Sequence, residues 1–460
     1  MIFLFPFLFS CTSSIESNSI SESTTESTIK STPKGTNQNT NSQGQPIKKT
    51  MQHQNNQGSG GALQDPSGFP AFHDWPAPKG PKITDVGVFS TPIQLTKKPE
   101  GGYRPQIAIG KDDTMHTIFY IRKTDGDVIH HRSSSDGIDW TTVEPLGHRK
   151  ERNWGPDIVV RDDGSVVVVY DHALEDFSSV GYITTYENGS WSEQQSLTPD
   201  GKKEVGSGHV ANGINGELVY MFIGKQLGPE YKFQARYRWF DGTSWSDIKY
   251  LSDGKEDTWH TNVERRPDGT FLGGYDIGTG GAATTLYLVD GRNGRFSSPF
   301  NMSKKSRPGE RPHFAFYQKD GLITDYVTWF HKERGQPKHI YVMQSRANPM
   351  NANNLDMDQW SNLQEPSLGY GGFHFDPEIA INQDGTLCLV WGWDSGEDAE
   401  LVYAINKGDG WSKPKKVADI NWGKPGLSSI DVDSKGNFHV VWNQGVRGYN
   451  EVYYATLRQP

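Results

Sequence analysis

The sequence predicts an all-β protein, a seven-bladed β-propeller with four antiparallel strands in each blade. The first observation is a repeated unit of roughly 45 to 60 residues, the length typical of one propeller blade. The second is a repeated turn with Gly, Trp and Ser, which reads FDGTSWSDIKYL at 240–251, YENGSWSEQQSL at 186–197 and KGDGWSKPKKV at 407–417. The third is a composition with 51 Gly and 14 Trp, which suits short strands joined by tight turns.

Each unit contains an apolar strand, a tight turn, a β-branched strand that ends in Tyr or Trp, a third strand, the Trp-bearing turn and a last strand. Seven units start near Tyr103, Asn153, Gly206, Thr258, Arg311, Phe373 and Leu427. Most of their first turns contain Asp-Gly or Asn-Gly, which are typical of hairpins. Because one thin blade cannot bury its own core, we expect the units to stack around an axis. The Trp side chains should fill the space between blades.

The last unit, which starts near Leu427, contains only three strands. The segment DVGVFSTPIQLT at 85–96 precedes the first unit and can supply the fourth strand. This pairing would close the ring and remove its open edges. The segment SSDGIDW at 134–140 also resembles the Asp-box of sialidase-type propellers, a motif that stabilises a turn.

The N-terminal residues predict export. MIFLFPFLFS is apolar but shorter than the roughly 20 residues that span a bilayer, and with Cys11 it resembles a lipobox. We therefore expect residues 1–11 to be a signal peptide with a lipid on Cys11, which gives a periplasmic or cell-surface lipoprotein anchored in the outer membrane; secretion is the alternative. Residues 12–80 are rich in Ser, Thr, Asn and Gln and predict a disordered tether. The catalytic propeller is expected at 83–460.

The composition narrows the partners and cofactors. A formal net charge of −9 argues against nucleic acid, which binds a basic face. Cys388 lies in an apolar strand and is expected to be a small buried hydrophobe, and no cysteine cluster suits zinc. We expect a monomer that requires no cofactor and touches a membrane only through its lipid. A structural calcium or zinc ion stays open, without assigned metal ligands.

Polar side chains gather on one rim of the predicted ring, where innermost strands begin and second strands end. The strand starts contribute Arg104, Asn153, Trp154, His209, Asn212, His260, Asn262, Arg311, His313 and His374. The second-strand ends contribute Tyr120, Arg122, Tyr170, His172, Tyr220, Lys225, Tyr275, His331 and Trp393. The carboxylates near this rim are Asp171, Asp276, Asp376 and Asp394. Because several blades meet there, we expect the functional site on this rim.

His, Tyr and Arg together suit β-elimination on a uronic acid. A cation or hydrogen-bond donor must hold the carboxylate so that the developing enolate is stabilised. A His or Tyr removes the C5 proton, and a Tyr or His protonates the oxygen that leaves C4. If that oxygen carries a sugar, the enzyme is a polysaccharide or oligosaccharide lyase. If it carries only hydrogen, water leaves and the enzyme is an oligosaccharide dehydratase.

Over roughly 100–460 the sequence resembles the seven-bladed ulvan lyase propellers and the related rhamnosidase-type propellers. In those lyases a His ends the second strand of one blade, and a Tyr and an Arg follow in the next. The stretches VVVVYDH, GELVYMF and YKFQARYRW place His172, Tyr220 and Arg236 at these positions. The resemblance implies that Arg236 holds a carboxylate while His172 and Tyr220 transfer protons.

The sequence departs from that family where a second His starts an innermost strand, because Asn153 or Trp154 stands there. His209, one blade further on, is the expected substitute. The predicted catalytic set is His172, Tyr220, Arg236 and His209. The predicted substrate-binding set is Arg104, Asn153, Trp154, Arg238, His260, His313 and His374. The implied substrate is an anionic poly- or oligosaccharide, a uronate-containing sulfated rhamnose glycan of ulvan type.

Two alternatives stay open at this point. The first is a glycoside hydrolase of rhamnosidase type, which would use an unusual His or a rim carboxylate. The second is a non-catalytic glycan-binding propeller at the cell surface, in which Trp154, Trp259 and Trp393 stack on sugar rings.

Overall fold

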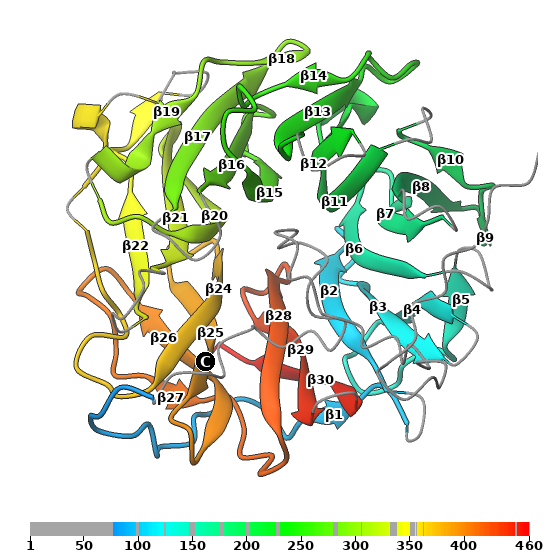
Figure 1. Cartoon of the computed structure of the whole chain (residues 1–460). Helices are drawn as coiled ribbons and strands as arrows, with labels where there is room; N and C mark the ends of the chain where they lie inside the picture. The colour runs from blue at the N-terminus through cyan, green and yellow to red at the C-terminus, as the bar shows by residue number, and fades with distance from the viewer. Residues whose placement is uncertain are drawn as a thin grey trace, which may run out of the picture. The chain divides into compact units, whose positions relative to one another are not determined.

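Seven antiparallel sheets stand around one axis in the computed structural model, which confirms the predicted seven-bladed propeller (Figure 1). The structure describes residues 77–97, 101–123, 126–146, 152–174, 179–198, 203–226, 231–278, 284–304, 306–331, 338–349, 355, 357–361, 363–446 and 449–459. The predicted signal peptide, Cys11 and most of the predicted tether lie outside these residues, so export and lipidation stay predictions. Within the described part, no helix has the length and apolar character needed to cross a membrane.

Each blade begins with its innermost strand and continues outward. Blade 1 contains β2 (Tyr103–Ile109), β3 (Met115–Lys123), β4 (Gly126–Ser134) and β5 (Glu144–Leu146). Blade 2 contains β6 (Asn153–Val160), β7 (Val166–Ala173), β8 (Ser179–Glu187), β9 (Ser190–Trp191) and β10 (Gln195–Ser196). Blade 3 contains β11 (Lys203–Asn212), β12 (Leu218–Gln226), β13 (Gln234–Phe240) and β14 (Lys249–Tyr250). Blade 4 contains β15 (Thr258–Arg265), β16 (Phe271–Ile277), β17 (Thr285–Arg292), β18 (Arg295–Phe296) and β19 (Phe300–Asn301).

The remaining three blades follow the same plan. Blade 5 contains β20 (Glu310–Lys319), β21 (Leu322–Phe330), β22 (Ile340–Gln344) and β23 (Asn348–Pro349). Blade 6 contains β24 (Phe373–Ile381), β25 (Leu387–Asp394), β26 (Ala399–Asn406) and β27 (Lys415–Lys416). Blade 7 contains β28 (Lys424–Val432), β29 (Phe438–Val446), β30 (Tyr449–Leu457) and β1 (Ile93–Gln94). Short 3₁₀ helices are η2 (Ile214–Gly216), η3 (Met302–Lys304) and η4 (Met357–Gln359).

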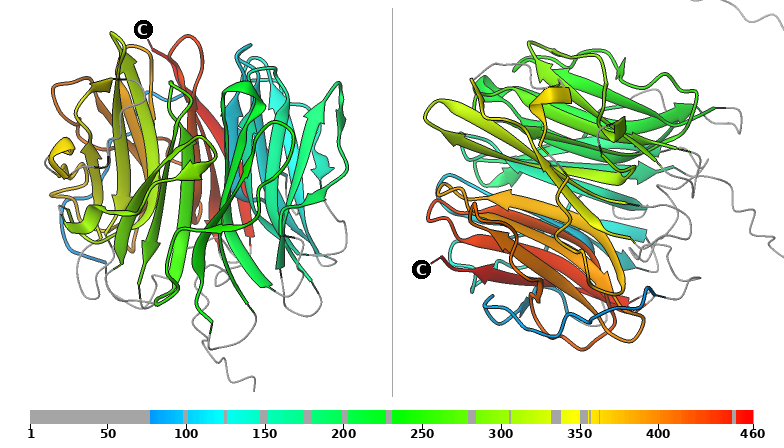
Figure 2. Two further views of the ribbon diagram at one scale, coloured as in Figure 1. Left: turned by 90° about the horizontal axis from the view of Figure 1, so that it is seen from above. Right: turned by 90° about the vertical axis from the view of Figure 1, so that its left-hand side faces the viewer.

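The ring is closed by the N-terminal strand, as the sequence predicts. β1 pairs antiparallel with β30, and Ile93 lies opposite Tyr454. Leu95 N donates to Val452 O at 2.8 Å, and the Thr96 hydroxyl donates to a buried glutamate carboxylate of the same blade. The two views in Figure 2 show the N-terminal segment lying along the C-terminal blades. Pairing the two ends of the described chain leaves the ring without a gap between its first and last repeats.

The core is distributed between neighbouring blades because successive side chains of a strand point to opposite faces of its sheet. In β7, Val166, Val168 and Tyr170 pack with blade 1. Val167 and Val169 of the same strand pack with blade 3. All five are at most 1% exposed. This alternation also decides which neighbour each polar residue at the end of β7 can reach.

The Trp-bearing turns and the Asp-box serve the fold, as predicted. The Trp191 ring lies 5.2 Å from the ring of His131 in blade 1. In the Asp-box, Asp136 Oδ1 accepts hydrogen bonds from Ile138 N at 2.8 Å and Asp139 N at 2.9 Å. Cys388 is fully buried in β25, as expected for a small hydrophobe. These features therefore need no role in chemistry.

A buried pair of imidazoles lies at the junction of blades 1 and 2. His116 Nδ1 and His131 Nε2 are 3.1 Å apart, and both side chains are buried. Burial lowers the pKa of His116 to about 4 and that of His131 to about 3. An unfolded histidine binds its proton near pH 6.5, so the unfolded chain gains protons before the folded chain does. Stability is therefore lost as the pH falls below about 6.5.

Lowering the pH from 7.5 to 5 is expected to reduce the free energy of unfolding by about 2 kcal/mol for each of these imidazoles. The substitution His131→Phe should shrink this pH effect by about 2 kcal/mol. Urea unfolding at both pH values measures it, and unfolding at pH 7.5 and pH 9 serves as the control because the wild type and the variant should respond equally there. Equal acid sensitivity of the variant and the wild type would contradict the assignment.

Candidate functional site

Every innermost strand carries a β-bulge close to its first residue, and the seven bulges encircle the axis. The first bulged residues are Arg104, Gly155, Ser207, Trp259, Arg311, Asp376 and Gly426. A bulge tolerates proline because the ladder needs no N–H there, and four bulges continue with Pro105, Pro156, Pro312 and Pro377. We call the region that these bulges surround the axial mouth.

Backbone strain is concentrated at the axial mouth. Left-handed φ values occur at Arg104 (49°), Ser207 (49°), Arg311 (56°) and Asp376 (48°). A non-glycine residue in this conformation costs about 1–2 kcal/mol. Such strain persists where the surroundings hold it, and it clusters at ligand sites. Four strained residues at equivalent positions therefore mark the mouth as a candidate site.

Blade 4 presents an oriented imidazole at the mouth. Asp276 of β16 is fully buried, and its Oδ1 accepts hydrogen bonds from Trp259 N at 3.3 Å and His260 N at 3.0 Å. Its Oδ2 accepts from Arg311 N at 3.1 Å and lies 2.8 Å from His260 Nδ1. This contact makes Nδ1 the protonated nitrogen, so Nε2 of the 18% exposed ring can accept a proton.

Two guanidinium groups reach the mouth from blades 1 and 5. Arg311 Nη1 lies 2.9 Å from Asp376 Oδ1 and is partly exposed. Arg104 is anchored by its backbone N, which donates to Asn443 Oδ1 at 3.2 Å. No carboxylate of the described residues forms an ion pair with the Arg104 guanidinium. Burial lowers the pKa of Arg104, and the charge of Arg311 acts in the same direction, so both groups share one electrostatic environment.

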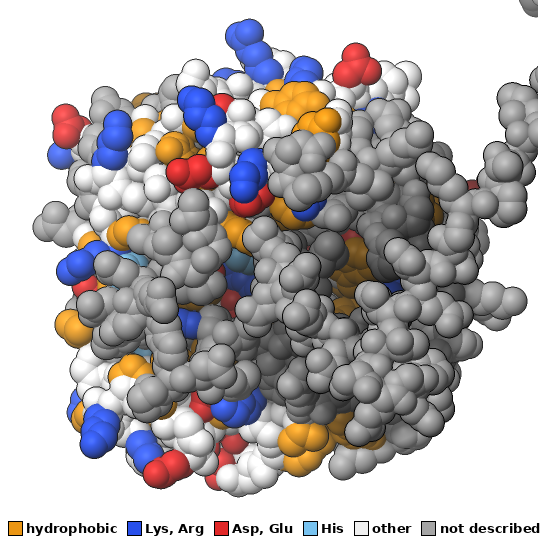
Figure 3. Space-filling model, in the orientation of Figure 1, with side chains coloured by type: hydrophobic (Ala, Val, Ile, Leu, Met, Phe, Trp, Pro, Cys, Tyr) orange, Lys and Arg blue, Asp and Glu red, His pale blue; other side chains and the backbone are white. Residues whose placement is uncertain are grey.

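Charged and imidazole side chains are visible together near the centre of the ring in the space-filling view along the axis (Figure 3). Lys or Arg, Asp or Glu, and His side chains all appear there between the other groups. Hydrophobic side chains are visible near the centre as well, so charged, imidazole and apolar groups lie together there.

Two buried acidic groups, the Asp171 carboxyl and the Tyr220 hydroxyl, lie between blades 2 and 3 and behind Arg104. Asp171 of β7 is 0% exposed, and neither carboxyl oxygen has a hydrogen-bond partner among the described residues. Burial raises the pKa of Asp171 to about 7, although Arg104 and the nearby Tyr220 hydroxyl oppose the rise. The Tyr220 hydroxyl passes between Gly181 and Gly208, where any side chain would collide with it. Burial and Asp171 raise the pKa of Tyr220.

The structure brings Tyr220 to Asp171 and not to His172. His172 is the next residue of β7, so strand alternation turns it to the other face, toward blade 1. There its Nδ1 lies 2.8 Å from Asn153 Oδ1, and its ring contacts the Tyr182 ring at 5.7 Å. The sheet of blade 2 thus separates the two predicted proton-transfer residues. The roles predicted for His172 and Tyr220 stay predictions, but they do not form a pair.

Arg238 lies directly opposite Tyr220 in the register of blade 3. Its Nε donates to Ser246 O at 2.7 Å and its Nη1 donates to Leu197 O at 3.0 Å. Leu197 belongs to blade 2, so Arg238 ties the two blades together. The structure therefore gives this predicted substrate-binding residue a structural contact on the interblade face.

Arg236 lies on the same face of blade 3, farther from the axis than the mouth. It is 3% exposed, donates to Gln234 Oε1 at 3.2 Å and lies 4.9 Å over the Tyr250 ring. None of the described carboxylates pairs with it, and burial lowers its pKa. A buried cation without a counter-ion is costly, and the anion-binding role of Arg236 stays a prediction.

His209 and His313 lie below the mouth, in an axial channel of about 310 Å³ lined by all seven innermost strands. His209 Nδ1 lies 3.4 Å from Asp157 Oδ2, and His313 Nδ1 lies 2.9 Å from Glu378 Oε2. Glu264 opens into this channel deep inside the ring, and that depth together with the surrounding carboxylates raises its pKa. An anionic sugar would meet like charges in the channel, so the mouth above it is the better anion site.

Trp154 and His374 are held by packing at the rim. Trp154 is partly buried against the core between blades 1 and 2. His374 is fully buried, and its Nδ1 accepts a hydrogen bond from Trp391 Nε1 at 2.9 Å. Burial lowers the pKa of His374 to about 3. The imidazole is therefore neutral and lies behind the mouth.

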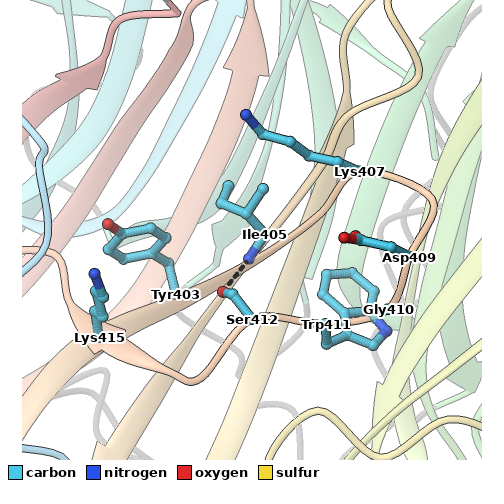
Figure 4. Close-up of a pocket in the computed structure, with 8 residues that line it drawn as sticks. All are labelled: Tyr403, Ile405, Lys407, Asp409, Gly410, Trp411, Ser412 and Lys415. Carbon is cyan, nitrogen blue, oxygen red and sulfur yellow. Dashed lines mark hydrogen bonds between the residues drawn. The ribbon is translucent and has the colours of Figure 1, made fainter.

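A second hollow, of about 440 Å³, lies on the outer part of blade 6 (Figure 4). It is lined by Tyr403, Ile405, Lys407, Asp409, Gly410, Trp411, Ser412 and Lys415. Trp411 Nε1 donates to Gln364 Oε1 of blade 5 at 2.7 Å, and Tyr403 is 4% exposed. The Tyr403 and Trp411 rings therefore serve packing. This hollow is larger than the axial channel, but it does not contain the oriented imidazole and paired guanidinium groups of the mouth.

Arg104 and His260 of the mouth were in the predicted substrate-binding set. Four further residues of the predicted rim were in neither the catalytic nor the substrate-binding set: Arg311, Asp276, Asp376 and Asp171. A proline shortly after the start of an innermost strand indicates the bulge. An Asp near the end of a second strand indicates a carboxylate that can contact residues of a bulge. The described residues contain no group of three or more His, Cys, Asp or Glu side chains placed to hold a metal ion.

No protein-family model and no curated protein sequence matches this chain. Among solved structures it is similar to a protein of unknown function from Dyadobacter fermentans, with a TM-score of 0.50 and 13% identity over 82% of this chain and 100% of that chain. It is also similar to α-L-arabinanase from Penicillium chrysogenum complexed with arabinobiose (TM-score 0.45, 11% identity, 82% of this chain, 98% of that chain).

A third similar structure is the Trypanosoma rangeli sialidase in complex with sialic acid, with a TM-score of 0.47 and 13% identity over 72% of this chain and 59% of that chain. The similarity to the Dyadobacter protein concerns the fold alone. The chain is a seven-bladed β-propeller.

Proposed function

We propose that this chain is a carbohydrate-active enzyme that catalyses β-elimination on a uronate-bearing saccharide, with the axial mouth as its active site. The observation that carries the proposal is the His260 imidazole, which Asp276 orients toward a mouth that also contains Arg104 and Arg311. Removal of a proton beside a carboxylate needs a base next to cations. The proposed substrate, from the sequence resemblance, is a sulfated rhamnose glycan of ulvan type.

Arg104 and Arg311 hold the uronate carboxylate. Asp376 already neutralises Arg311 and fixes its position, whereas Arg104 has no counter-ion among the described residues. Arg104 is therefore the group best prepared to accept a ligand carboxylate, and a guanidinium can do so with two parallel hydrogen bonds. Both cations stabilise the negative charge that grows on the carboxylate when the C5 proton leaves.

His260 transfers the proton in this scheme. Its Nε2 takes the proton from C5, the C5–H electron pair forms the C4–C5 double bond, and the C4–O bond breaks. The leaving oxygen takes its proton from the imidazolium when the two groups lie on one face of the sugar ring. Asp276 holds the ring orientation and stabilises the imidazolium without taking a proton itself. Sugar as the leaving group gives a lyase, and water gives a dehydratase.

Incubation of the purified protein with ulvan and with ulvan-derived oligosaccharides tests the proposal. Elimination creates a conjugated double bond, so ultraviolet absorbance should rise with time. Mass spectrometry then separates the two leaving groups, because a dehydratase product is lighter than its substrate by one water. Binding without any product would support the non-catalytic glycan-binding propeller and refute the enzyme.

Glycoside hydrolysis is the second candidate, and Asp171 favours it. A carboxyl group with a pKa raised to about 7 can act as a general acid at neutral pH, and Asp376 supplies a second carboxylate at the mouth. Hydrolysis would give new reducing ends without ultraviolet absorbance. That product pattern decides between the two enzymes in the same incubation.

The residues from the family resemblance give a separate test. Tyr220→Phe and His172→Ala should each lower turnover by about 10²-fold if the side chain transfers a proton, with a much smaller loss of stability. Arg236→Ala should mainly weaken binding of anionic substrate. Steady-state rates and unfolding curves of each variant measure both effects. A variant that keeps full activity removes its residue from the site.

A further inference from the structure

We infer that Asp171 is a positioning residue that sets the pH range of substrate binding through Arg104. When Asp171 is neutral, the Arg104 guanidinium is available to an anionic ligand; when Asp171 is ionised, it attracts that guanidinium and competes with the ligand. This inference rests on the proposed function, because it requires that Arg104 binds the acidic group of the substrate.

The two groups approach each other across a single glycine. A Cβ on Gly155 would lie 3.0 Å from Asp171 Oδ2 and 3.9 Å from Arg104 Nη1. The carboxyl oxygen and the guanidinium nitrogen are therefore about 7 Å apart at most, a distance at which a charge inside a protein still acts strongly. Gly155 has a φ of 58° and no side chain to screen the pair.

Asp171 is buried next to few polar groups. It is 0% exposed, and none of the described donors reaches its two oxygens at hydrogen-bond distance, while burial raises its pKa and the nearby Tyr220 hydroxyl opposes that rise. Native proteins usually satisfy buried polar atoms, so an unsatisfied carboxyl group needs an explanation. The explanation inferred here is that Asp171 gains a proton when the ligand binds and loses it when the ligand leaves.

The other titratable groups near this pair are Tyr220, Tyr120, Arg311 and Asp376. Tyr220 approaches Asp171 from blade 3, and burial followed by the charge of Asp171 raises the pKa of its hydroxyl. Tyr120, Arg311 and Asp376 act on Arg104. Burial raises the pKa of Tyr120 to about 12, and Arg311 and Asp376 form an ion pair with each other.

The charge of Asp171 depends on pH near neutrality. Burial raises its pKa to about 7, so its negative charge develops as the pH rises through that value. A ligand anion on Arg104 favours the protonated form of Asp171, and binding takes up a proton. Affinity should consequently decrease as the pH rises above 7.

Calorimetric binding of a uronate-terminated ulvan oligosaccharide tests the inference. The experiment uses His260→Gln protein, in which the proposed base is absent and the oligosaccharide is not turned over. We expect affinity to fall about tenfold between pH 6 and pH 9, the change that one pKa unit of coupling produces. Adding Asp171→Asn should give tight binding at every pH. Adding Asp409→Asn, an exposed Asp in blade 6, should leave the pH dependence intact.

Three results of this binding experiment would overturn the inference. The first is the same pH dependence in the Asp171→Asn protein as in its parent. The second is loss of binding at all pH values in a folded Asp171→Asn protein, because that indicates a purely structural role. The third is a result with Tyr220→Phe, a variant that also tests the inference if Asp171→Asn does not fold. Its hydroxyl lowers the pKa of Asp171, so the loss of affinity should move to higher pH, and an unchanged midpoint contradicts the coupling.

Titration of the Asp171 carboxyl carbon by NMR, in the protein without saccharide, separates this inference from the proposed function. Replacing Arg104 with Gln should raise the pKa of Asp171, because a favourable cation is lost. If the oligosaccharide binds at no pH, the proposed function fails. The titration still measures whether Arg104 influences the pKa of Asp171. An Asp171 pKa that is unaffected by Arg104→Gln overturns the inference itself.

Discussion

Replacing His260 with glutamine is expected to lower kcat for the proposed elimination by about 10²–10⁴-fold, the usual contribution of a general base. Glutamine keeps much of the polar volume but cannot take a proton. Substrate affinity should change much less, because Arg104 and Arg311 are the groups proposed to bind the carboxylate. Ultraviolet absorbance under saturating substrate measures kcat, and calorimetry measures binding.

The control for this variant is His439→Gln, which changes an imidazole in blade 7 that contacts the Tyr454 hydroxyl at 2.7 Å. Folded His439→Gln should retain kcat. Asp276→Asn should lower kcat and also alter its pH profile, because an amide stabilises the imidazolium less than a carboxylate. A His260→Gln protein with wild-type kcat would disprove the assignment of the base.

Replacing Arg266 with alanine is expected to reduce the free energy of unfolding by about 3–5 kcal/mol, the cost of breaking a buried ion pair. Arg266 is 2% exposed at the end of β15. Its Nε and Nη2 each donate to Asp325 of blade 5 at 2.8 Å, and its Nη1 lies 3.3 Å from Asp290 of blade 4. Alanine would leave both carboxylates buried without this cation.

Urea unfolding measures this loss, and the exposed pair of Lys82 and Glu397 provides the comparison. Their side chains are 47% and 79% exposed, so Lys82→Ala should lower the free energy of unfolding far less than Arg266→Ala does. The loss of unfolding free energy in Arg266→Lys should lie between those of Arg266→Ala and Lys82→Ala, because lysine keeps the charge but cannot make the two parallel hydrogen bonds to Asp325. Equal effects of Arg266→Ala and Lys82→Ala would contradict the interblade role.

Much of the fold could be predicted because each repeat is recognisable from residue patterns within its own segment of the sequence. Alternating apolar residues, Asp-Gly turns and Trp-bearing turns specify each blade without reference to the others. The start of the first unit at Tyr103 and the closing strand at 93–94 follow from the same patterns. Even the Asp136 turn performs the role that its sequence predicts.

The site was predicted less well, because neighbouring residues of a strand face different blades. The YDH stretch contains Asp171 and His172, and only the packing shows that Asp171 meets Tyr220. Likewise, His260 was predicted to bind substrate, and its partnership with Asp276 depends on a bulge that turns two backbone N–H groups toward one carboxylate. A single bulge shifts the register by one residue and so changes which side chains meet.

The sequence by itself determined the number of blades, the order of strands within each blade and the rim on which polar groups gather, because these depend on local periodicity and turn chemistry. The tertiary structure alone decided which groups share the axial mouth. Arg104, His260 and Arg311 come from three blades, and their grouping depends on the closed ring and on the bulges. Long-range packing sets that geometry, and no local pattern encodes it.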